Sequence, residues 1–167
     1  AMEDTIPEHL RQFGYDMVTL DVDGLSSSEF NARLIRDAIL DMQQEGTDPD
    51  LVLVGYSKGA PDILQAIVSY PEIHHRVAAV VSAAGSVGGS PLAYDATDAQ
   101  LNMLQHFPGA TCKPGEQGAL TDLRPDTRKA WLASNPLPEG IPYYSLMTFP
   151  EPERISSMLR GSYKKIG

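Results

Sequence analysis

The chain of 167 residues is poor in cysteine, in positive charge and in long apolar runs, and each shortage excludes a class of protein. Its single cysteine, Cys112, rules out an intramolecular disulfide and a zinc site built from cysteines. Thirteen Lys and Arg stand against 22 Asp and Glu, so the formal net charge of -9 opposes binding to nucleic acid or to an anionic membrane surface. No apolar stretch approaches the length of a membrane span. One cysteine leaves the compartment open, cytoplasmic or exported.

The rest of the composition is that of an ordinary soluble globular protein. Hydrophobic residues make up 42% of the chain and charged residues 21%. A length of 167 residues suits a single domain with an adequate hydrophobic core. We therefore expect residues 1–167 to form one domain.

One segment carries a pattern that indicates chemistry. Residues 51–54 are a continuous apolar run of strand length, which predicts a central parallel strand covered on both faces. The run leads into Gly55-Tyr-Ser57-Lys58-Gly59, which we call the serine turn, and apolar residues at helical spacing follow. A Gly-x-Ser-x-Gly turn between a strand and a helix exposes the serine hydroxyl, which attacks an acyl carbon when a base removes its proton. The alternative is that both glycines serve packing and Ser57 caps the helix.

Strands and helices alternate along the chain, which predicts a parallel sheet with helices on both faces. Apolar spacing, capping residues, glycine and proline set the expected limits of each element. The expected helices are 6–13, one from Ser26, Ser27 or Ser28 to Gly46, 60–70 and 152–159, and the expected strands are 15–22, 51–54, 76–82 and 141–149.

Residues 92–140 interrupt this alternation between the strands at 76–82 and 141–149. An excursion of this length is more than a connector, because most connections run about 4–6 residues. Its patterns predict helices near 98–106 and 127–134 that carry several apolar side chains. These side chains either cover a substrate pocket, as a lid does, or fill a small core of their own.

The serine turn and the elements around it resemble one known family. The order of elements over nearly the whole chain is similar to that of the α/β-hydrolase fold, with the serine turn at the family's nucleophile position. The sequences at 56–62 and 80–93 look like those of bacterial lipase- and esterase-like members. The resemblance implies an α/β-hydrolase-like, doubly wound, mainly parallel sheet with a lid-like insertion at 92–140.

The same resemblance implies roles for the residues of the serine turn. Ser57 would be the nucleophile, the backbone N–H of Lys58 one donor of the oxyanion hole, and Gly55 and Gly59 the glycines of the elbow. We expect the Lys58 side chain itself to be solvated at the surface. The resemblance implies no metal and no organic cofactor.

Parts of the family pattern have no counterpart in this chain, so we expect the fold to be incomplete at both ends. The family has further strands before its first helix, the last of which carries the oxyanion loop, and its catalytic histidine follows the last strand. Among the histidines here, His9 lies in the first expected helix, and His74 and His75 lie at the end of the sheet opposite Ser57. His106 in the insertion is the one expected to reach the active-site side, where it is either the base or an exposed lid residue.

Four carboxylates are candidates for the catalytic acid. Asp95 and Asp98 follow one core strand, and Glu151 and Glu153 follow the next, which are two places where the family carries its catalytic acid. Each of the four also fits a solvated or helix-capping carboxylate.

The strand that is missing would lie between 15–22 and 51–54, which leaves two apolar strands with unpaired edges. Either the sheet closes up in a rearranged order, or a second copy of the chain or a complementing segment pairs with these edges.

The sequence therefore predicts a serine-dependent hydrolase of small-molecule carboxylic esters, of lipase or esterase type, that acts through an acyl-enzyme on Ser57. The alternative is a non-catalytic interaction or assembly subunit that keeps the fold without the catalytic triad. A phosphate-binding turn is disfavoured by the glycine spacing and by the net charge.

Overall fold

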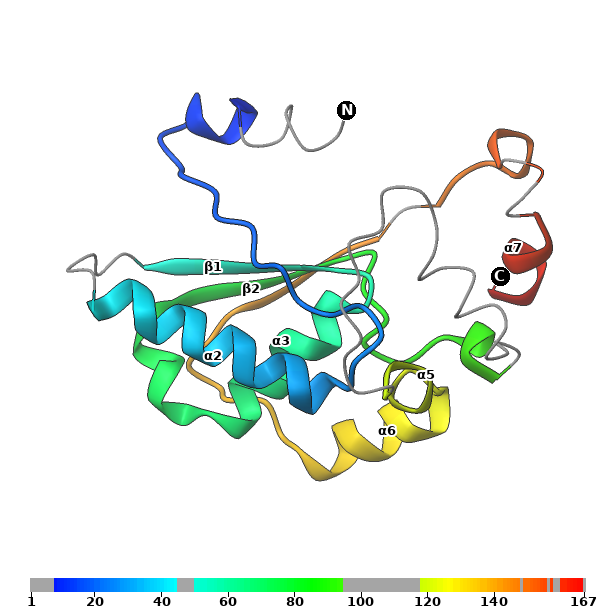
Figure 1. The fold of residues 1–167 in the computed structure, drawn as a ribbon. Helices are drawn as coiled ribbons and strands as arrows, with labels where there is room; N and C mark the ends of the chain where they lie inside the picture. The colour runs from blue at the N-terminus through cyan, green and yellow to red at the C-terminus, as the bar shows by residue number, and fades with distance from the viewer. Residues whose placement is uncertain are drawn as a thin grey trace.

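The computed structural model describes residues 8–44, 50–94, 118–147, 149–155, 157 and 160–166. Three parallel strands form one sheet in the order β1-β2-β3 (Figure 1): β1 is Leu51–Tyr56, β2 is Val77–Ala83 and β3 is Tyr143–Leu146. The strands expected at 51–54, 76–82 and 141–149 are therefore present, the last of them shorter than expected.

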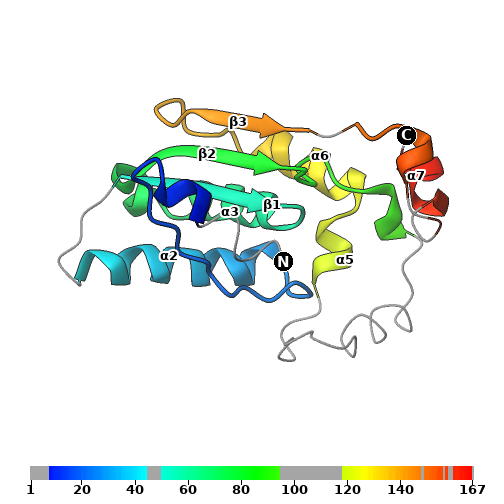
Figure 2. The same ribbon diagram turned by 90° about the horizontal axis from the view of Figure 1, so that it is seen from above.

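The carboxyl ends of the three strands meet at one edge of the sheet (Figure 2). Tyr56 pairs with Ala83, and Ala83 pairs with Leu146, so the segments that follow the strands start next to one another. Ligands of open α/β sheets bind at this edge, outside the carboxyl ends of the strands.

Helices α2 (Ser28–Gln44) and α3 (Gly59–Ser69) pack against each other and lie on the same face of the sheet (Figure 1). Ser27 caps α2, because its Oγ accepts a hydrogen bond of 3.2 Å from the backbone N–H of Phe30. Apolar side chains at helical spacing on α2 and α3 form the core together with the inner faces of the strands. The buried core consists of Ala32, Ile35, Ile39, Ile63, Leu64, Ala66, Ile67, Ile73, Val77, Val80 and Ile141.

Shorter elements make up the rest of the described chain. They are η1 (Pro71–Arg76), η2 (Pro91–Tyr94), α5 (Ala119–Asp122), α6 (Pro125–Ser134), η3 (Pro152–Arg154) and α7 (Arg160–Ile166). Helix α6 matches the helix expected near 127–134, whereas the helix expected near 98–106 lies outside the described residues. None of the described helices is both long enough and apolar enough to cross a membrane.

The prediction of a closing helix at 152–159 is wrong. A short 3₁₀ turn, η3, is followed at Ile155 by extended backbone, and α7 begins only at Arg160. Ile155 buries its side chain in this extended conformation, with 9% of its surface exposed, and a residue with extended φ and ψ ends a helix.

The prediction of a strand at 15–22 is also wrong. Residues 8–11 are helical and Gly14 ends that segment with a φ of +81°, as a left-handed glycine does, but residues 15–23 form no strand. A strand exists only by pairing, and within the described part of the chain β1 pairs with β2 alone. Tyr15 and Val18 are accordingly more than 60% exposed.

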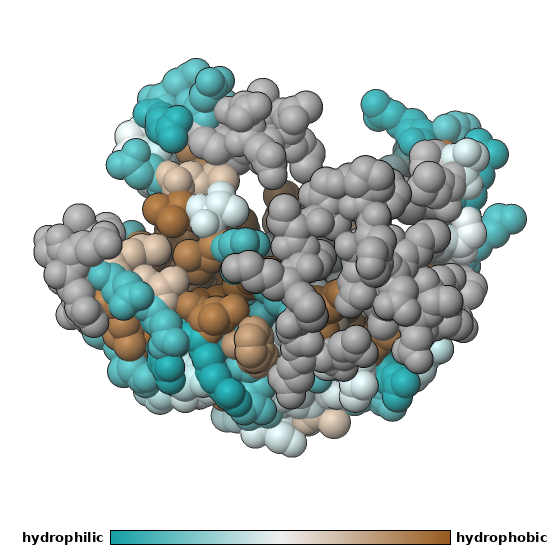
Figure 3. All heavy atoms as spheres, viewed as in Figure 1, coloured by the Kyte–Doolittle hydropathy of each residue, from teal (hydrophilic) through white to brown (hydrophobic). Residues whose placement is uncertain are grey.

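The structure also corrects the expectation that the β1 strand is covered on both faces. Val52, Val54 and Tyr56 are 52%, 62% and 71% exposed, and Tyr144 and Leu146 of β3 are each 61% exposed. Strand side chains alternate between faces, and α2 and α3 cover only the face opposite these residues. Figure 3, in the same view as Figure 1, shows hydrophobic residues gathered in the region of the sheet, between the N-terminal segment and α2.

Candidate active site

Ser57 lies at the junction of β1 and α3, at the carboxyl edge of the sheet. Its φ is +50°, a left-handed conformation that residues other than glycine seldom adopt. Three backbone hydrogen bonds hold it there: its N–H donates to the Ala83 carbonyl at 3.1 Å, and its carbonyl accepts from Ala60 at 3.3 Å and from Ser86 at 3.1 Å. Ser57 is exposed, so its hydroxyl is accessible to a ligand.

The two glycines of the serine turn differ in what the structure requires of them. A Cβ at Gly55 would lie 2.6 Å from the Cα and from the N of Ala60, so β1 and α3 approach each other too closely for any side chain there. A Cβ at Gly59 would meet no described heavy atom within 4 Å. Of the two glycines in the serine turn, Gly55 is therefore the one that the close packing of β1 and α3 requires.

The side chain of Lys58 is not solvated, contrary to expectation. Lys58 is 9% exposed, and its Nζ donates to both carboxylate oxygens of Asp62, at 2.8 and 2.9 Å. Asp62 lies one turn further along α3 and is 1% exposed. A charge this deeply buried is stable only beside an opposite charge, and the i,i+4 spacing brings this pair together on one side of the helix.

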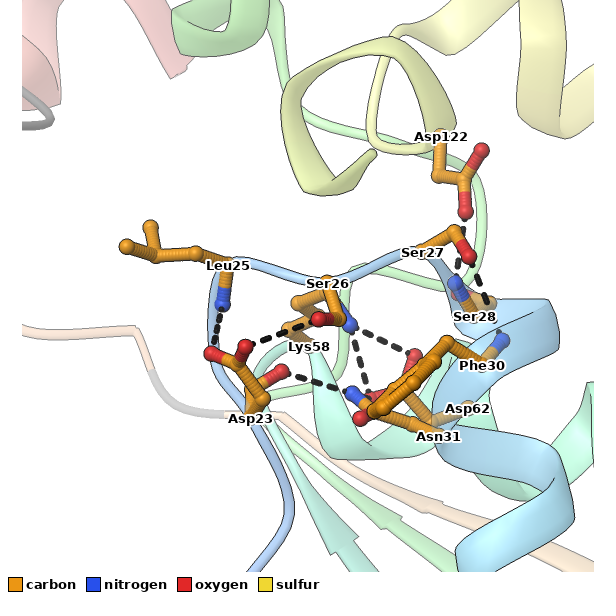
Figure 4. Close-up of polar contacts among 10 residues, drawn as sticks. All are labelled: Asp23, Leu25, Ser26, Ser27, Ser28, Phe30, Asn31, Lys58, Asp62 and Asp122. Carbon is orange, nitrogen blue, oxygen red and sulfur yellow. Dashed lines mark hydrogen bonds and ion pairs between the residues drawn. The ribbon is translucent and has the colours of Figure 1, made fainter. Parts of the chain in front are cut away.

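The ion pair belongs to a larger buried cluster that sequence reasoning missed (Figure 4). Asn31 of α2, fully buried, donates from its Nδ2 to Asp62 Oδ2 and to the Asp23 carbonyl, both at 2.8 Å. The Asp23 carboxylate in turn accepts from the backbone N–H of Leu25 at 3.0 Å and from Ser26 Oγ at 2.8 Å. We call Asp23, Ser26, Asn31, Lys58 and Asp62 the Asp62 network. The sequence signals for it were the spacing of Lys58 and Asp62 and a polar Asn31 within an otherwise apolar stripe of α2.

The backbone N–H of Lys58, unlike its side chain, has no hydrogen-bond partner among the described residues. Its carbonyl accepts a hydrogen bond of 3.3 Å from Asp62 N–H, but among the described residues its own N–H donates to none. This N–H follows directly after Ser57, at the start of α3, where the free N–H groups of a helix favour negative charge. The turn thus presents an exposed hydroxyl beside an unused backbone donor.

No histidine in the described segments is hydrogen-bonded to Ser57. His74 and His75 lie in η1, between the end of α3 and the start of β2, which is the opposite edge of the sheet, as expected. The Nε2 of His74 is 2.7 Å from the Ile67 carbonyl, and His9 is exposed in the N-terminal helical segment.

Of the remaining candidates, only Glu151 and Glu153 lie among the described residues, and neither is hydrogen-bonded to Ser57. Glu151 and Glu153 are exposed on the segment after β3. His106, Asp95 and Asp98 lie outside the described residues.

A cavity of about 330 Å³ lies away from the serine turn, between α2, α3 and α6. Ser28, Gln65, Asp122, Arg128 and Trp131 are among the residues that line it. Burial lowers the pKa of the Arg128 guanidinium, which donates from Nε to the Val87 carbonyl at 3.1 Å. Ser57 does not line this cavity.

Comparison with solved structures identifies the fold that this arrangement of strands and helices belongs to. The crystal structure of the metagenomic carboxyl esterase MGS0156 is similar with a TM-score of 0.83 and 36% sequence identity, over 96% of this chain and 48% of that chain. The mature Bacillus licheniformis lipase BlEst2 is similar with a TM-score of 0.66 and 22% identity, over 86% of this chain and 57% of that chain. The chain has the α/β-hydrolase fold.

Within the α/β-hydrolase fold, the extent of the match is itself informative. The chain spans about half the length of the solved esterase and lipase structures, so those proteins contain further elements beyond the part matched here. The propeptide form of BlEst2 matches with a TM-score of 0.68, 20% identity and 86% of this chain over 31% of that one. No protein-family model and no curated protein matches the chain.

The left-handed backbone at Ser57 leads to a prediction about stability. Ser57→Gly should melt about 2–4 °C above Ser57→Ala, because glycine adopts positive φ without the steric cost of about 1–2 kcal/mol that a Cβ brings. Both variants lack the hydroxyl, so the comparison isolates the backbone. Differential scanning calorimetry measures it, and an alanine variant that melts at or above the glycine variant would contradict the strain.

Proposed function

We propose that this chain supplies the nucleophile and one oxyanion donor of a serine-dependent carboxylic-ester hydrolase of the lipase or esterase type. The observation that carries the proposal is the serine turn itself: an exposed Ser57 at φ +50° beside the unused backbone N–H of Lys58. The likeness to a carboxyl esterase at 36% identity supports an ester as the substrate.

In the proposed reaction, Ser57 Oγ attacks the ester carbonyl carbon while a base takes the hydroxyl proton. The carbonyl oxygen becomes an oxyanion and accepts a hydrogen bond from the Lys58 N–H. The base then gives its proton to the leaving alkoxide, the C–O bond breaks, and Ser57 carries the acyl group. Water, deprotonated by the same base, attacks the acyl-enzyme and releases the acid and the serine. The insertion at 92–140 would cover the acyl group, and His106 is the candidate base within this chain.

A fluorophosphonate probe tests the proposal directly, because it reacts only with an activated serine hydroxyl. Mass spectrometry of the labelled peptide should place the adduct on Ser57. The probe is applied to the 167-residue chain and to the longest polypeptide that its reading frame encodes, because a base can come from either.

A non-catalytic assembly subunit is the second candidate, favoured by two observations. No described histidine is hydrogen-bonded to Ser57, and in the described part of the chain β1 pairs with β2 alone and leaves an apolar face exposed. A p-nitrophenyl ester assay run beside light scattering separates the two. Serine-dependent turnover supports the enzyme, and assembly without labelling or turnover supports the subunit.

We expect the 167-residue chain alone to hydrolyse esters poorly and to self-associate through this edge and face.

Val54→Asp should reduce the mass measured by light scattering, because it places a charge on the exposed face. It should change the free energy of unfolding of the monomer by less than about 1 kcal/mol. Val80→Asp is the matched control: Val80 is 3% exposed, so the buried charge should unfold the chain. A monodisperse monomer of the unmodified chain would contradict self-association.

A further inference from the structure

We propose that Asp62 is a positioning residue for the oxyanion donor: its carboxylate anchors the buried Lys58 side chain and, together with the hydrogen bonds to the Ser57 carbonyl, keeps the Lys58 backbone N–H in one direction. This inference rests on the proposed function, since it concerns the donor next to Ser57. Asp62 itself is 1% exposed, so its carboxylate is out of reach of a substrate.

The geometry forms a clamp. The Asp62 carboxylate accepts from Lys58 Nζ with both oxygens, at 2.8 and 2.9 Å, and the Asp62 N–H donates to the Lys58 carbonyl at 3.3 Å. The Lys58 N–H shares a peptide plane with the Ser57 carbonyl, which Ala60 and Ser86 hold, and the Asp62 contacts hold Lys58 on the other side of its Cα. The N–H itself donates to no described residue. A lysine side chain alone is a flexible tether, but burial to 9% exposure and a second contact at the backbone restrict how residue 58 can rotate.

The clamp is in turn anchored to a second element. Asn31 Nδ2 donates to Asp62 Oδ2 and to the Asp23 carbonyl, and both partners only accept, so the orientation of the Asn31 amide is fixed by its surroundings. Asp23 also accepts from Leu25 and Ser26. The start of α3, the start of α2 and the loop at 23–26 are thereby joined beside the serine turn (Figure 4).

A purely structural role would not need charges at these positions. A well-packed apolar pair often stabilises a fold as much as a buried ion pair does, and sometimes more. A buried ion pair with fixed directions is instead suited to holding one group in one orientation, as a catalytic donor requires. Stability and positioning can therefore be separated by experiment.

The test uses Lys58→Met/Asp62→Leu, which removes both charges and leaves no buried charge unpaired. The backbone N–H of residue 58 is still present in this variant. In the polypeptide that shows Ser57-dependent turnover, kcat for a p-nitrophenyl ester should fall about 10–100-fold with KM unchanged, because a donor displaced by about 1 Å costs on the order of 10²-fold. Hydrogen exchange at the residue 58 amide should become faster. The single variant Lys58→Arg keeps the ion pair with Asp62 and should retain most of the kcat of the unmodified protein.

Arg33→Gln is the matched control, since it breaks an exposed ion pair with Glu29 on α2 and should leave kcat, KM and the exchange rate unchanged. A double variant that melts like the unmodified protein and keeps its kcat would overturn the inference. If the double variant does not fold, Asn31→Ala decides: a roughly tenfold lower kcat at constant KM supports positioning, and an unchanged kcat overturns it. Absence of Ser57-dependent turnover in the unmodified protein would instead overturn the proposed function.

Discussion

Ser57→Ala is expected to abolish fluorophosphonate labelling and, in the polypeptide that shows Ser57-dependent turnover, to lower kcat by roughly 10⁴–10⁶-fold. The substitution removes the oxygen that forms the acyl-enzyme and leaves the Lys58 N–H and substrate binding in place. Only the residual acceleration from the oxyanion donor and from binding should remain. The measurement is kcat for a p-nitrophenyl ester, beside gel fluorescence of the labelled protein.

Ser69→Ala is the matched control for this prediction. Ser69 is the last residue of α3, at the end far from Ser57, and its Oγ accepts a hydrogen bond from the Gln65 side chain at the surface. Its loss should leave labelling and turnover at the level of the unmodified protein. Labelling that survives Ser57→Ala would show that another residue is the nucleophile.

Asp62→Leu is expected to lower the free energy of unfolding by about 3–5 kcal/mol. The Lys58 ammonium would remain buried, without the carboxylate that now accepts both of its hydrogen bonds. Asn31 Nδ2 would lose one acceptor as well. Urea denaturation followed by circular dichroism measures the change as a shift of the midpoint at constant slope.

The double variant Lys58→Met/Asp62→Leu provides the internal control for stability. With both charges gone, the free energy of unfolding should return to within about 1–2 kcal/mol of the unmodified chain. A single Asp62→Leu variant as stable as the unmodified chain would mean that water or a rearranged Lys58 satisfies the ammonium.

Local sequence patterns were sufficient for the elements that border the serine turn. Four apolar residues at 51–54, a glycine at 55 and helical spacing afterwards fix a strand, a tight approach and a helix through interactions within a few residues. Gly55 is the clearest case, because the steric demand comes from Ala60, only five positions away. The same holds for Ser27, whose capping contact with Phe30 spans three positions.

Features that depend on distant partners could not be read in the same way. The segment 15–22 has the composition of a strand, but pairing depends on a neighbour that the sequence of the segment does not specify. The same is true of Val54, where an apolar run predicts burial but exposure depends on which helices cover the sheet. Lysine usually lies at the surface, so the sequence predicts a solvated Lys58, whereas its burial depends on Asp62 of α3 and, through Asp62, on Asn31 of α2.

The hydrogen bonds of Ser57 to Ala83 and Ser86 have a consequence for protein engineering. Two of the three bonds that keep the left-handed serine in place come from the last residue of β2, Ala83, and from Ser86 just after it, and Ala84 between them also has a positive φ, of +45°. The serine turn is therefore not a transferable cassette: copying residues 55–59 into another parallel sheet would omit the groups that brace it. A functional graft would have to carry residues 83–86 and the β1–β2 pairing register along with the turn.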